Sequence, residues 1–378
     1  MELLDIGRVL LGLVLLIGGG EVLVRGASAL ATKLGIPPLV VGLVIVSAAT
    51  STPELAVTIG AVIDEEPSLA VGNVVGSNIV NVLLILGLSA LFLPLAVKRR
   101  LVKFDLPVMV GISILLLVLA LDGEITQIDG VILFAAAVAH VVLSFTLSRK
   151  DPDAVPDDAA AATDPSQTGP VRTRRAPASG VLSYLIPVVL ILAGIGLLVF
   201  GADLLVTGAV AIATGFGVSS LVIGLTVVAI GTSLPELATS IAAVLRGERD
   251  LAVGNIVGSN IFNIGVVLGL PAIFFPAGIP VPDAAISLDI PLMIAAAVAL
   301  VPIAFTGFTI ARWEGAVFVG LYVAYTVYLI LAAVAHDALR GFSIVMLFFV
   351  LPLLAVTLIA VTAYEVGLRR GRRETPTP

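Results

Sequence analysis

Long apolar stretches, each about as long as a membrane-spanning helix, follow one another along most of this chain. A helix needs about 20 predominantly apolar residues to cross the hydrocarbon core of a bilayer. The first stretch is longer than the apolar part of a signal peptide and has no small-residue cleavage site, so we interpret it as a membrane helix. Eleven spans are predicted, near residues 5–31, 36–62, 68–94, 104–121, 126–147, 183–214, 218–245, 250–277, 285–306, 313–335 and 341–364.

One polar stretch interrupts this pattern. Residues 148–182 are rich in proline and charged residues and short of large apolar side chains. Such a segment cannot bury enough apolar surface to order itself, so we expect a flexible linker. It divides the chain into residues 1–147 with five spans and residues 183–335 with five more. Residues 336–378 then carry an eleventh span and a basic tail.

Composition supports a membrane protein. The chain is 59% hydrophobic and 12% charged, whereas a soluble domain carries about 25% charged residues. The absence of cysteine excludes disulfides. Nothing in the sequence indicates a cofactor, a nucleic-acid partner or an obligate protein partner, so the lipid bilayer is the expected surrounding.

The distribution of charge predicts the orientation. Loops that face the cytoplasm carry an excess of lysine and arginine. If the N-terminus lies outside, the acidic turn at 62–67 also lies outside, and Arg340 is the one exception. The basic residues that then lie inside are Arg25, Lys33, Lys98, Arg99, Arg100, Lys103, the linker arginines, Arg246, Arg249, Arg312 and the tail arginines. We therefore expect a cell-membrane protein whose linker and C-terminus are cytoplasmic.

The two halves of the chain are related in sequence. Residues 42–60 (GLVIVSAATSTPELAVTIG) match residues 224–242 (GLTVVAIGTSLPELATSIA), and residues 71–81 match residues 253–263, both at an offset of 182. The offset spans five membrane segments, and because five is odd the second copy enters the membrane from the opposite side. The predicted fold is an all-α membrane protein with two inverted-topology repeats of five transmembrane helices plus an eleventh C-terminal helix. In secondary transporters of this plan the substrate binds near the midplane.

Each first motif places a carboxylate inside an apolar span. Glu54 lies in TSTPE and Glu236 in TSLPE. A carboxylate at the bilayer centre costs several kcal/mol unless it has a partner. No lysine or arginine lies at matching depth in these segments, so a bound cation is the expected partner.

The prolines of these motifs predict a break in each helix. Pro53 and Pro235 cannot donate a backbone hydrogen bond, so the carbonyls of residues 47–50 and 229–232 are expected to be free. Ser51-x-x-Glu54 and its copy Ser233-x-x-Glu236 also match a capping box. A plain proline kink with a local cap is the alternative, and repetition with the glutamate retained makes it less favoured.

The second motif adds hydroxyls and amides. Ser77 and Asn81 share a helix face, as do Ser259 and Asn263. A packing seam of small residues is the alternative for these segments. For four asparagines the sequence does not decide between an ion ligand and a structural role in helix packing: Asn73, Asn78, Asn255 and Asn260.

All these donors are oxygen, which suits a hard cation. Ca²⁺ takes six to eight oxygen ligands, and the same oxygens could hold more than one Na⁺. A passive channel is less favoured because channels build filters from symmetric rings. An intramembrane enzyme is disfavoured because no nucleophile and base pair is present.

Four polar residues outside the motifs remain. Glu21 and Asp203 also keep the offset of 182 and either tune ion access or sit at helix ends. His140 and His336 are interpreted as interfacial residues.

These motifs resemble those of the sodium/calcium exchanger family in the cation/Ca²⁺ antiporter superfamily, prokaryotic type with two α-repeats. The resemblance covers both repeats and implies exchange of Na⁺ for Ca²⁺ by alternating access; the alternative is a Ca²⁺/H⁺ or K⁺-dependent antiporter on the same fold. It also implies that spans one and six slide over the core formed by the motif helices.

The resemblance also implies a set of ion ligands. Glu54 and Glu236 correspond to the calcium carboxylates, with the carbonyls of Thr50 and Thr232. Sodium ligands would be Ser51, Ser233, Ser77, Ser259 and the carbonyls of Ser47 and Ala229, with Asn81 and Asn263 at the remaining polar positions. The first repeat departs from the family pattern at Ala49, which stands where the second has Gly231, and Asn263 stands where some relatives have aspartate. These differences bear on stoichiometry and ion preference.

Overall fold

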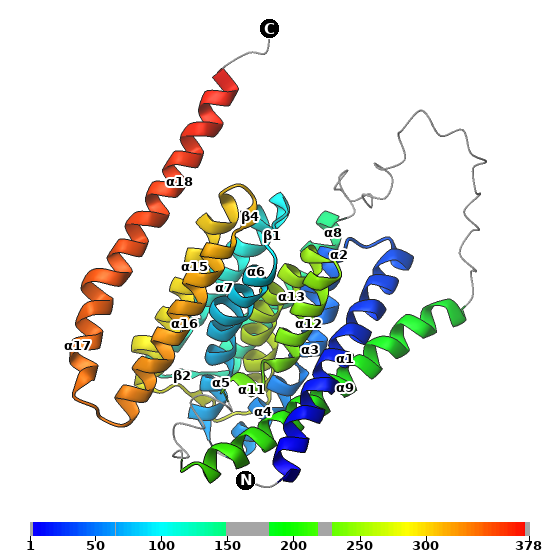
Figure 1. Cartoon of the computed structure of the whole chain (residues 1–378), viewed down its shortest axis with the longest axis horizontal. Coiled ribbons are helices and arrows are strands. Elements are labelled where there is room, and N and C mark those ends of the chain that lie inside the picture. The colour runs from blue at the N-terminus through cyan, green and yellow to red at the C-terminus, as the bar shows by residue number, and fades with distance from the viewer. Residues whose placement is uncertain (1–2, 65, 149–180, 218–228, 375–378) are drawn as a thin grey trace.

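The computed structural model describes residues 3–64, 66–148, 181–217 and 229–374 (Figure 1). Helices dominate throughout, as the apolar pattern predicts, because a chain in lipid must satisfy its backbone groups internally. The predicted linker lies outside the described residues except at its ends, where Ser148 closes one helix and residues 181–182 open the next. Its flexibility therefore stays a prediction.

The first half of the chain begins with two membrane-crossing units. The first unit is α1 (Leu3–Leu34). The second is made of α2 (Pro38–Val40), η1 (Val41–Val46), α3 (Ser47–Thr50) and α4 (Thr52–Ile63). Three further units complete this half: α5 (Pro67–Ile79), η2 (Val80–Leu86), α6 (Gly87–Phe92), β1 (Leu95–Ala96), η3 (Leu101–Asp105), α7 (Leu106–Leu119), η4 (Ala120–Asp122), β2 (Glu124–Ile125) and α8 (Gln127–Ser148).

The second half repeats this order. It contains α9 (Val181–Gly215), α11 (Ala229–Gly231), α12 (Leu234–Leu245), α13 (Arg249–Phe262), η8 (Asn263–Leu268), α14 (Gly269–Phe274), β3 (Ile279–Pro280), η9 (Ala285–Asp289), α15 (Ile290–Phe305), β4 (Thr309–Ile310) and α16 (Arg312–Ala333). The last elements, α17 (Ala338–Val345), η10 (Met346–Val350) and α18 (Leu351–Glu374), lie at the left edge of Figure 1.

Most of the predicted spans are present. Within the described part of the chain, nine helices are long and apolar enough to cross a membrane, and a tenth span is the pair Pro38–Thr50 and Thr52–Ile63, bent by 42°. The predicted eleventh span is one of the nine, at Ala338–Glu365. The predicted span at 218–245 is seen as α11 and α12, because residues 218–228 lie outside the described ranges.

The crossing of α1 and α9 shows the symmetry of the two halves. A Cβ on Gly12 would lie 2.7 Å from the backbone nitrogen of Leu205, and a Cβ on Gly194 would lie 2.7 Å from that of Leu23. Gly12 and Gly194 are 182 residues apart, and so are Leu23 and Leu205. The two long helices therefore cross about a pseudo-twofold axis, with glycine allowing the backbones to touch. The crossing of α1 (dark blue) and α9 (green) is seen at the right of Figure 1.

Two short antiparallel β-pairs join the halves. β1 pairs with β4, with Leu95 opposite Ile310, and β2 pairs with β3, with Ile125 opposite Ile279. Each pair takes one strand from each half. The connections of the two halves are therefore fastened to each other through backbone hydrogen bonds.

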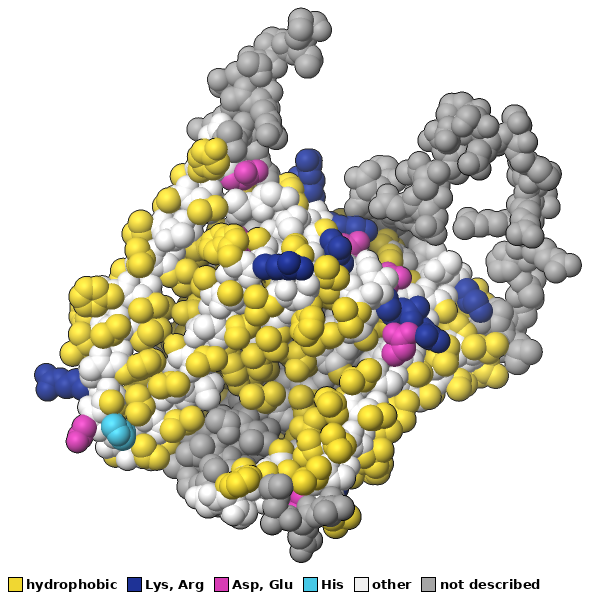
Figure 2. Space-filling model, viewed as in Figure 1, with side chains coloured by type: hydrophobic (Ala, Val, Ile, Leu, Met, Phe, Trp, Pro, Cys, Tyr) yellow, Lys and Arg dark blue, Asp and Glu magenta, His cyan; other side chains and the backbone are white. Residues whose placement is uncertain are grey.

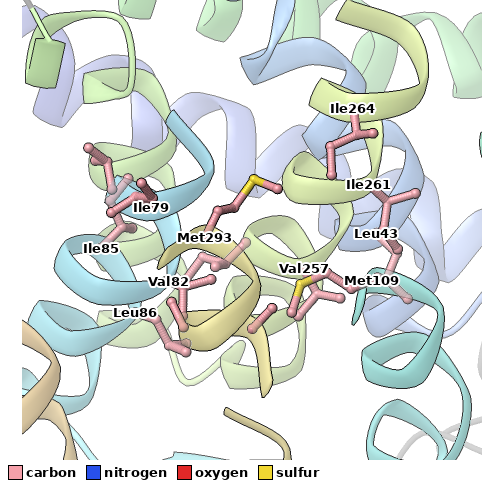
Figure 3. Close-up of a cluster of buried hydrophobic side chains, with 14 of the residues drawn as sticks. Leu43, Ile79, Val82, Ile85, Leu86, Met109, Val257, Ile261, Ile264 and Met293 are labelled. Carbon is pink, nitrogen blue, oxygen red and sulfur yellow. The ribbon is translucent and has the colours of Figure 1, made fainter. Parts of the chain in front are cut away.

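Side chains from both halves form one core. Figure 3 shows Leu43, Val82, Met109, Val257 and Met293 close together, and they come from η1, η2, α7, α13 and α15. On the face shown in Figure 2, exposed apolar side chains cover much of the surface. A soluble protein would not expose such a surface, so this face is suited to lipid.

His140 is not the interfacial residue that the sequence indicated. Its ring is buried, and its Nε2 lies 3.0 Å from Oδ1 of the buried Asp105. Arg100 is near the same carboxylate, at 3.9 Å, and donates to the Ser144 carbonyl at 2.7 Å. The prediction failed because a histidine near a span end looks solvent-accessible until its aspartate partner, 35 residues away, is known. His336 is exposed, and its interfacial position stays a prediction.

Candidate functional site

The helix breaks predicted at the two prolines are present. α3 ends at Thr50, Ser51 has φ −83° and ψ 8°, and α4 begins at Thr52. In the second half Ser233 has φ −90° and ψ 8° before α12. The same local sequence thus makes the same break twice, since proline cannot continue the preceding helix.

The breaks release fewer carbonyls than predicted. The Ser47 carbonyl still accepts the Ser51 N–H at 2.9 Å, and the Ala48 carbonyl accepts the Thr52 hydroxyl at 3.0 Å. The prediction was wrong for these two carbonyls. The helical hydrogen-bond pattern continues as far as the Ser51 N–H, and the Thr52 hydroxyl takes the place of a backbone N–H on the Ala48 carbonyl. Pro53 has no N–H to offer the Ala49 carbonyl.

The predicted capping boxes do not form. Neither Ser51 nor Ser233 makes a side-chain cap hydrogen bond. Ser51 Oγ instead donates to Glu236 Oε1 in the opposite half, at 3.2 Å. The mirror-image bond from Ser233 to Glu54 is not made, although the two groups are close enough to interact electrostatically.

The two glutamates are buried without adequate partners. Glu54 and Glu236 are 0% and 1% exposed. Among the described residues, neither oxygen of Glu54 nor Oε2 of Glu236 has a hydrogen-bond partner, and no ion pair involves either residue. Unpaired carboxylates in a dry interior are costly. Glu54 and Glu236 are close enough to interact electrostatically, so a cation bound between them would relieve this cost.

The second motif of each repeat also contains buried polar side chains, and several of their atoms lack a hydrogen-bond partner among the described residues. Asn81 is buried, and both its amide atoms lack a partner within the described part of the chain. The same holds for Ser259 Oγ and Asn263 Oδ1. Ser77 is also buried. These side chains come from α5, η2, α13 and η8, so both halves contribute candidate ligands of matching type.

The hydroxyls of the first motif are used differently. Ser47 Oγ donates to the Gly42 carbonyl at 2.7 Å and to the Asn255 carbonyl at 2.9 Å. Thr50 Oγ1 bonds to the Val46 carbonyl at 3.1 Å and contacts Asn255 Oδ1 at 3.3 Å. Both hydroxyls are therefore occupied by the scaffold. In the second half Ala229 opens α11 and Thr232 follows it.

The four asparagines left open by the sequence form scaffold bonds. Asn73 donates to the Glu54 carbonyl and to Thr58, each at 3.0 Å. Its counterpart Asn255 donates to Ser240 at 3.3 Å. The remaining bonds run from Asn78 to the Asn260 carbonyl at 3.2 Å, from Asn263 to Asn78 at 3.1 Å and from Asn260 to the Ile256 carbonyl at 2.8 Å.

Glycines of the second motif bring the helices together. A Cβ on Gly258 would lie 2.2 Å from the Leu43 carbonyl oxygen, and one on Gly254 would lie 2.6 Å from that of Leu39. The packing-seam interpretation therefore holds for these glycines. It does not compete with the candidate site, since Ser259 Oγ and Asn263 Oδ1 of the same segment have no partner among the described residues.

Sequence reasoning missed the partner of Glu21. This residue lies well inside α1, so it is no helix-end residue, and it pairs with Arg25 at 2.7 Å and with Arg246 at the end of α12. Asp203, at the matching position, lies inside α9 and is exposed. The offset of 182 between the repeats singles out Glu21 and Asp203 in the sequence. It does not indicate that Arg246 pairs with Glu21.

Several known proteins are similar to this chain. The family profile described as sodium/calcium exchanger protein matches residues 4–146 and 186–331, one match in each half. The chain is 39% identical over 279 residues to the inner membrane protein YrbG of Escherichia coli (strain K12), covering 73% of this chain and 82% of YrbG. It is 33% identical over 347 residues to the sodium/calcium exchanger MaX1 of Methanosarcina acetivorans, covering 85% and 97%.

The fold comparison agrees. A solved structure of the sodium-calcium exchanger NCX_Mj, soaked with Na⁺ and Ca²⁺, superposes with a TM-score of 0.69 at 30% identity, covering 85% of this chain and 97% of that one. The chain is an all-helical integral membrane protein with two repeats of one family, and a transporter rather than an enzyme. It belongs to the sodium/calcium exchanger family.

Proposed function

We propose that this antiporter exchanges Na⁺ for Ca²⁺ by alternating access, with the ions bound between the two repeats. The observation that carries the proposal is the pair Glu54 and Glu236. They are buried from solvent, come from opposite repeats, and have no cationic side chain beside them among the described residues. A divalent cation would neutralise both carboxylates at once.

The proposed calcium ligands are these two carboxylates and the carbonyls of Thr50 and Thr232. The proposed sodium ligands are Ser51, Ser233, Ser77, Ser259 and the carbonyls of Ser47 and Ala229, with Asn81 and Asn263 completing the shell. Unpartnered oxygens on several of these residues support the assignment. The Ser47 carbonyl accepts the Ser51 N–H at 2.9 Å and the Thr50 hydroxyl at 3.4 Å, so an ion would take the place of the longer contact on this oxygen.

Shared ligands explain antiport. If one Ca²⁺ and several Na⁺ use the same two carboxylates, their occupancies exclude each other. The relatives support this choice of ions, since MaX1 is named a sodium/calcium exchanger and NCX_Mj was soaked with Na⁺ and Ca²⁺.

A difference between the two flanks of the candidate site supports alternating access. On one flank of the site, α1 packs on α12, and a Cβ on Gly20 would lie 2.8 Å from the Ala238 carbonyl oxygen. On the matching flank Ala56 is exposed, and no described atom lies within 4 Å of a Cβ built on Gly60. One flank is thus covered by α1, and the other is left open by the described part of the chain. With the predicted orientation, the open flank faces outside.

The test is calcium uptake into proteoliposomes loaded with sodium, with and without an outward sodium gradient, at fixed pH and potassium. Uptake that requires the sodium gradient is expected. Uptake that ignores sodium and follows a proton or potassium gradient would replace the proposal with one of the related antiport modes. Uptake without any counter-ion would contradict antiport altogether.

A further inference from the structure

Helical serines and threonines in a membrane normally satisfy their hydroxyls on their own helix. Ser113 donates to the Met109 carbonyl at 2.8 Å, Thr326 to that of Tyr322 at 3.0 Å, and Thr362 to that of Leu358 at 2.6 Å. Each bond reaches back four residues. Thr239 and Ser89 depart from this behaviour. Both are 0% exposed, and neither hydroxyl has a partner among the described residues.

Thr239 lies on the same face of α12 as Glu236. It follows Glu236 by three residues, so the two side chains are neighbours on the helix surface. The Ala238 carbonyl lies against Gly20 of α1, and Ser240, which follows Glu236 by four residues, already accepts from Asn255 of α13. Besides α1 and α13, α12 packs on α9, η2, α6 and α3, and of these η2 and α6 carry the unpartnered Asn81 and Ser89.

Ser89 approaches that face from the other side. On α6, Gly87 packs on α16, where a Cβ would lie 3.0 Å from the Gly315 carbonyl oxygen. Ser89 follows Gly87 by two residues and therefore points to nearly the opposite side of the helix. α6 packs on α12 as well as on α16, so the buried Ser89 hydroxyl lies on the side toward α12. It is about two turns beyond Asn81, whose amide is also unpartnered.

The two hydroxyls lie on the same side of the site. From Glu236, α12 runs through Thr239 toward Arg246, and from Asn81, η2 and α6 run through Ser89 toward Lys98. Both helices end at the membrane face that the charge pattern predicts to be cytoplasmic. The hydroxyls are therefore staggered between the glutamates and that face.

We propose that Thr239 and Ser89 bind the transported cation transiently as it passes between the glutamate site and the face that carries Arg246. This inference rests on the proposed antiport function. A cation that leaves its ligands inside a protein needs replacement oxygens, because an unsolvated charge is very costly there. Hydroxyl oxygens with free lone pairs are suitable ligands for hard cations.

The feature is present in only one of the two repeats. At the offset of 182, the counterpart of Thr239 is Val57 and the counterpart of Ser89 is Pro271. Neither can offer a side-chain oxygen. A general need for small polar residues in helix packing would have been met in both repeats. The asymmetry instead fits a role on one side of the membrane, where the covered flank must open for ion passage.

The variants Thr239→Val and Ser89→Ala test the proposal. Valine is nearly isosteric with threonine and is already used at the matching position in the first repeat. We expect the maximal rate of calcium uptake to fall about fivefold in each, as for the loss of one good polar contact in a rate-limiting step. The equilibrium affinity for Ca²⁺, measured by direct binding to purified protein, should stay unchanged. Thr239→Ser should restore the rate.

The matched control is Ser113→Ala, which removes a buried hydroxyl that is already satisfied on its own helix. It should leave the rate unchanged. Wild-type rates in both test variants would overturn the proposal, and so would a loss of rate that Thr239→Ser fails to restore. A parallel loss of calcium affinity would also overturn it, since the residues would then belong to the resting site.

Thiol labelling gives a second readout that does not depend on rate. The chain has no cysteine, so Thr239→Cys carries one unique thiol. We expect a membrane-impermeant thiol reagent to modify it during turnover from the face that carries Arg246. Modification only from the opposite face, or none, would contradict the proposal. If the wild type exchanges other ions, the same variants assayed with those ions still test this inference separately from the proposed function.

Discussion

The hydroxyl of Ser51 donates to the carboxylate of Glu236 across the boundary between the two repeats, at 3.2 Å. The two residues are 185 positions apart in the chain, and each belongs to its own copy of the same motif. The candidate site is therefore built from both repeats at once. The matching bond from Ser233 to Glu54 is absent, so the two copies are not equivalent in this conformation.

Removing either carboxylate should abolish calcium transport. In Glu54→Gln or Glu236→Gln, an amide replaces a charge that the cation needs, and we expect calcium uptake to fall to background, with normal membrane insertion. Uptake into proteoliposomes is the measurement, and Ser113→Ala serves as the folded control. Calcium transport by the double glutamine variant would remove the basis of the site assignment.

The ion pair between Glu21 and Arg246 should hold α1 against α12. Both side chains are partly exposed, so each such pair is worth only about 0–1 kcal/mol. In Glu21→Gln we expect a cysteine at Ala242 to react with an impermeant thiol reagent about two to five times faster, because α1 leaves α12 more often. The charge exchange Glu21→Arg with Arg246→Glu should reverse part of this gain. Equal labelling rates in all variants would show that the pair does not contribute.

The buried contact of His140 with Asp105 should support the stability of the fold. His140→Ala leaves a buried carboxylate short of a partner, which typically costs about 1–3 kcal/mol. We expect a lower melting temperature in detergent. The exposed His336 provides the control, since His336→Ala should leave the melting temperature unchanged. An unaltered melting temperature in His140→Ala would show that Arg100 alone is a sufficient partner.

Gly258 should tolerate no side chain. A Cβ there would lie 2.2 Å from the Leu43 carbonyl oxygen and 2.4 Å from Ser47 Oγ. Gly258→Ala forces the two backbones apart, and overpacking of this kind costs about 1–3 kcal/mol. The yield of folded protein on size-exclusion chromatography should fall. The matched control is Gly76→Ala at the equivalent position of the first repeat, where no described atom lies within 4 Å. Equal yields would contradict the predicted difference.

The sequence by itself determined the spans, the duplication and the position of the two glutamates. These features are linear: apolar length reports membrane crossing, a fixed offset reports a repeat, and a carboxylate inside an apolar span reports a polar interior. The proline-induced breaks were predictable too, because the missing N–H is a property of proline alone.

The tertiary structure decided which polar groups meet. Ser51 bonds to Glu236 instead of capping its own helix, and His140 is buried against Asp105 instead of lying at the interface. Whether Thr239 or Thr362 keeps its hydroxyl free depends on what each helix faces. A side chain's partner is chosen by competition among groups brought together from distant segments, and the cost of leaving one unpaired is set by burial. Sequence order contains neither the competitor nor the burial, so only the folded arrangement could supply them.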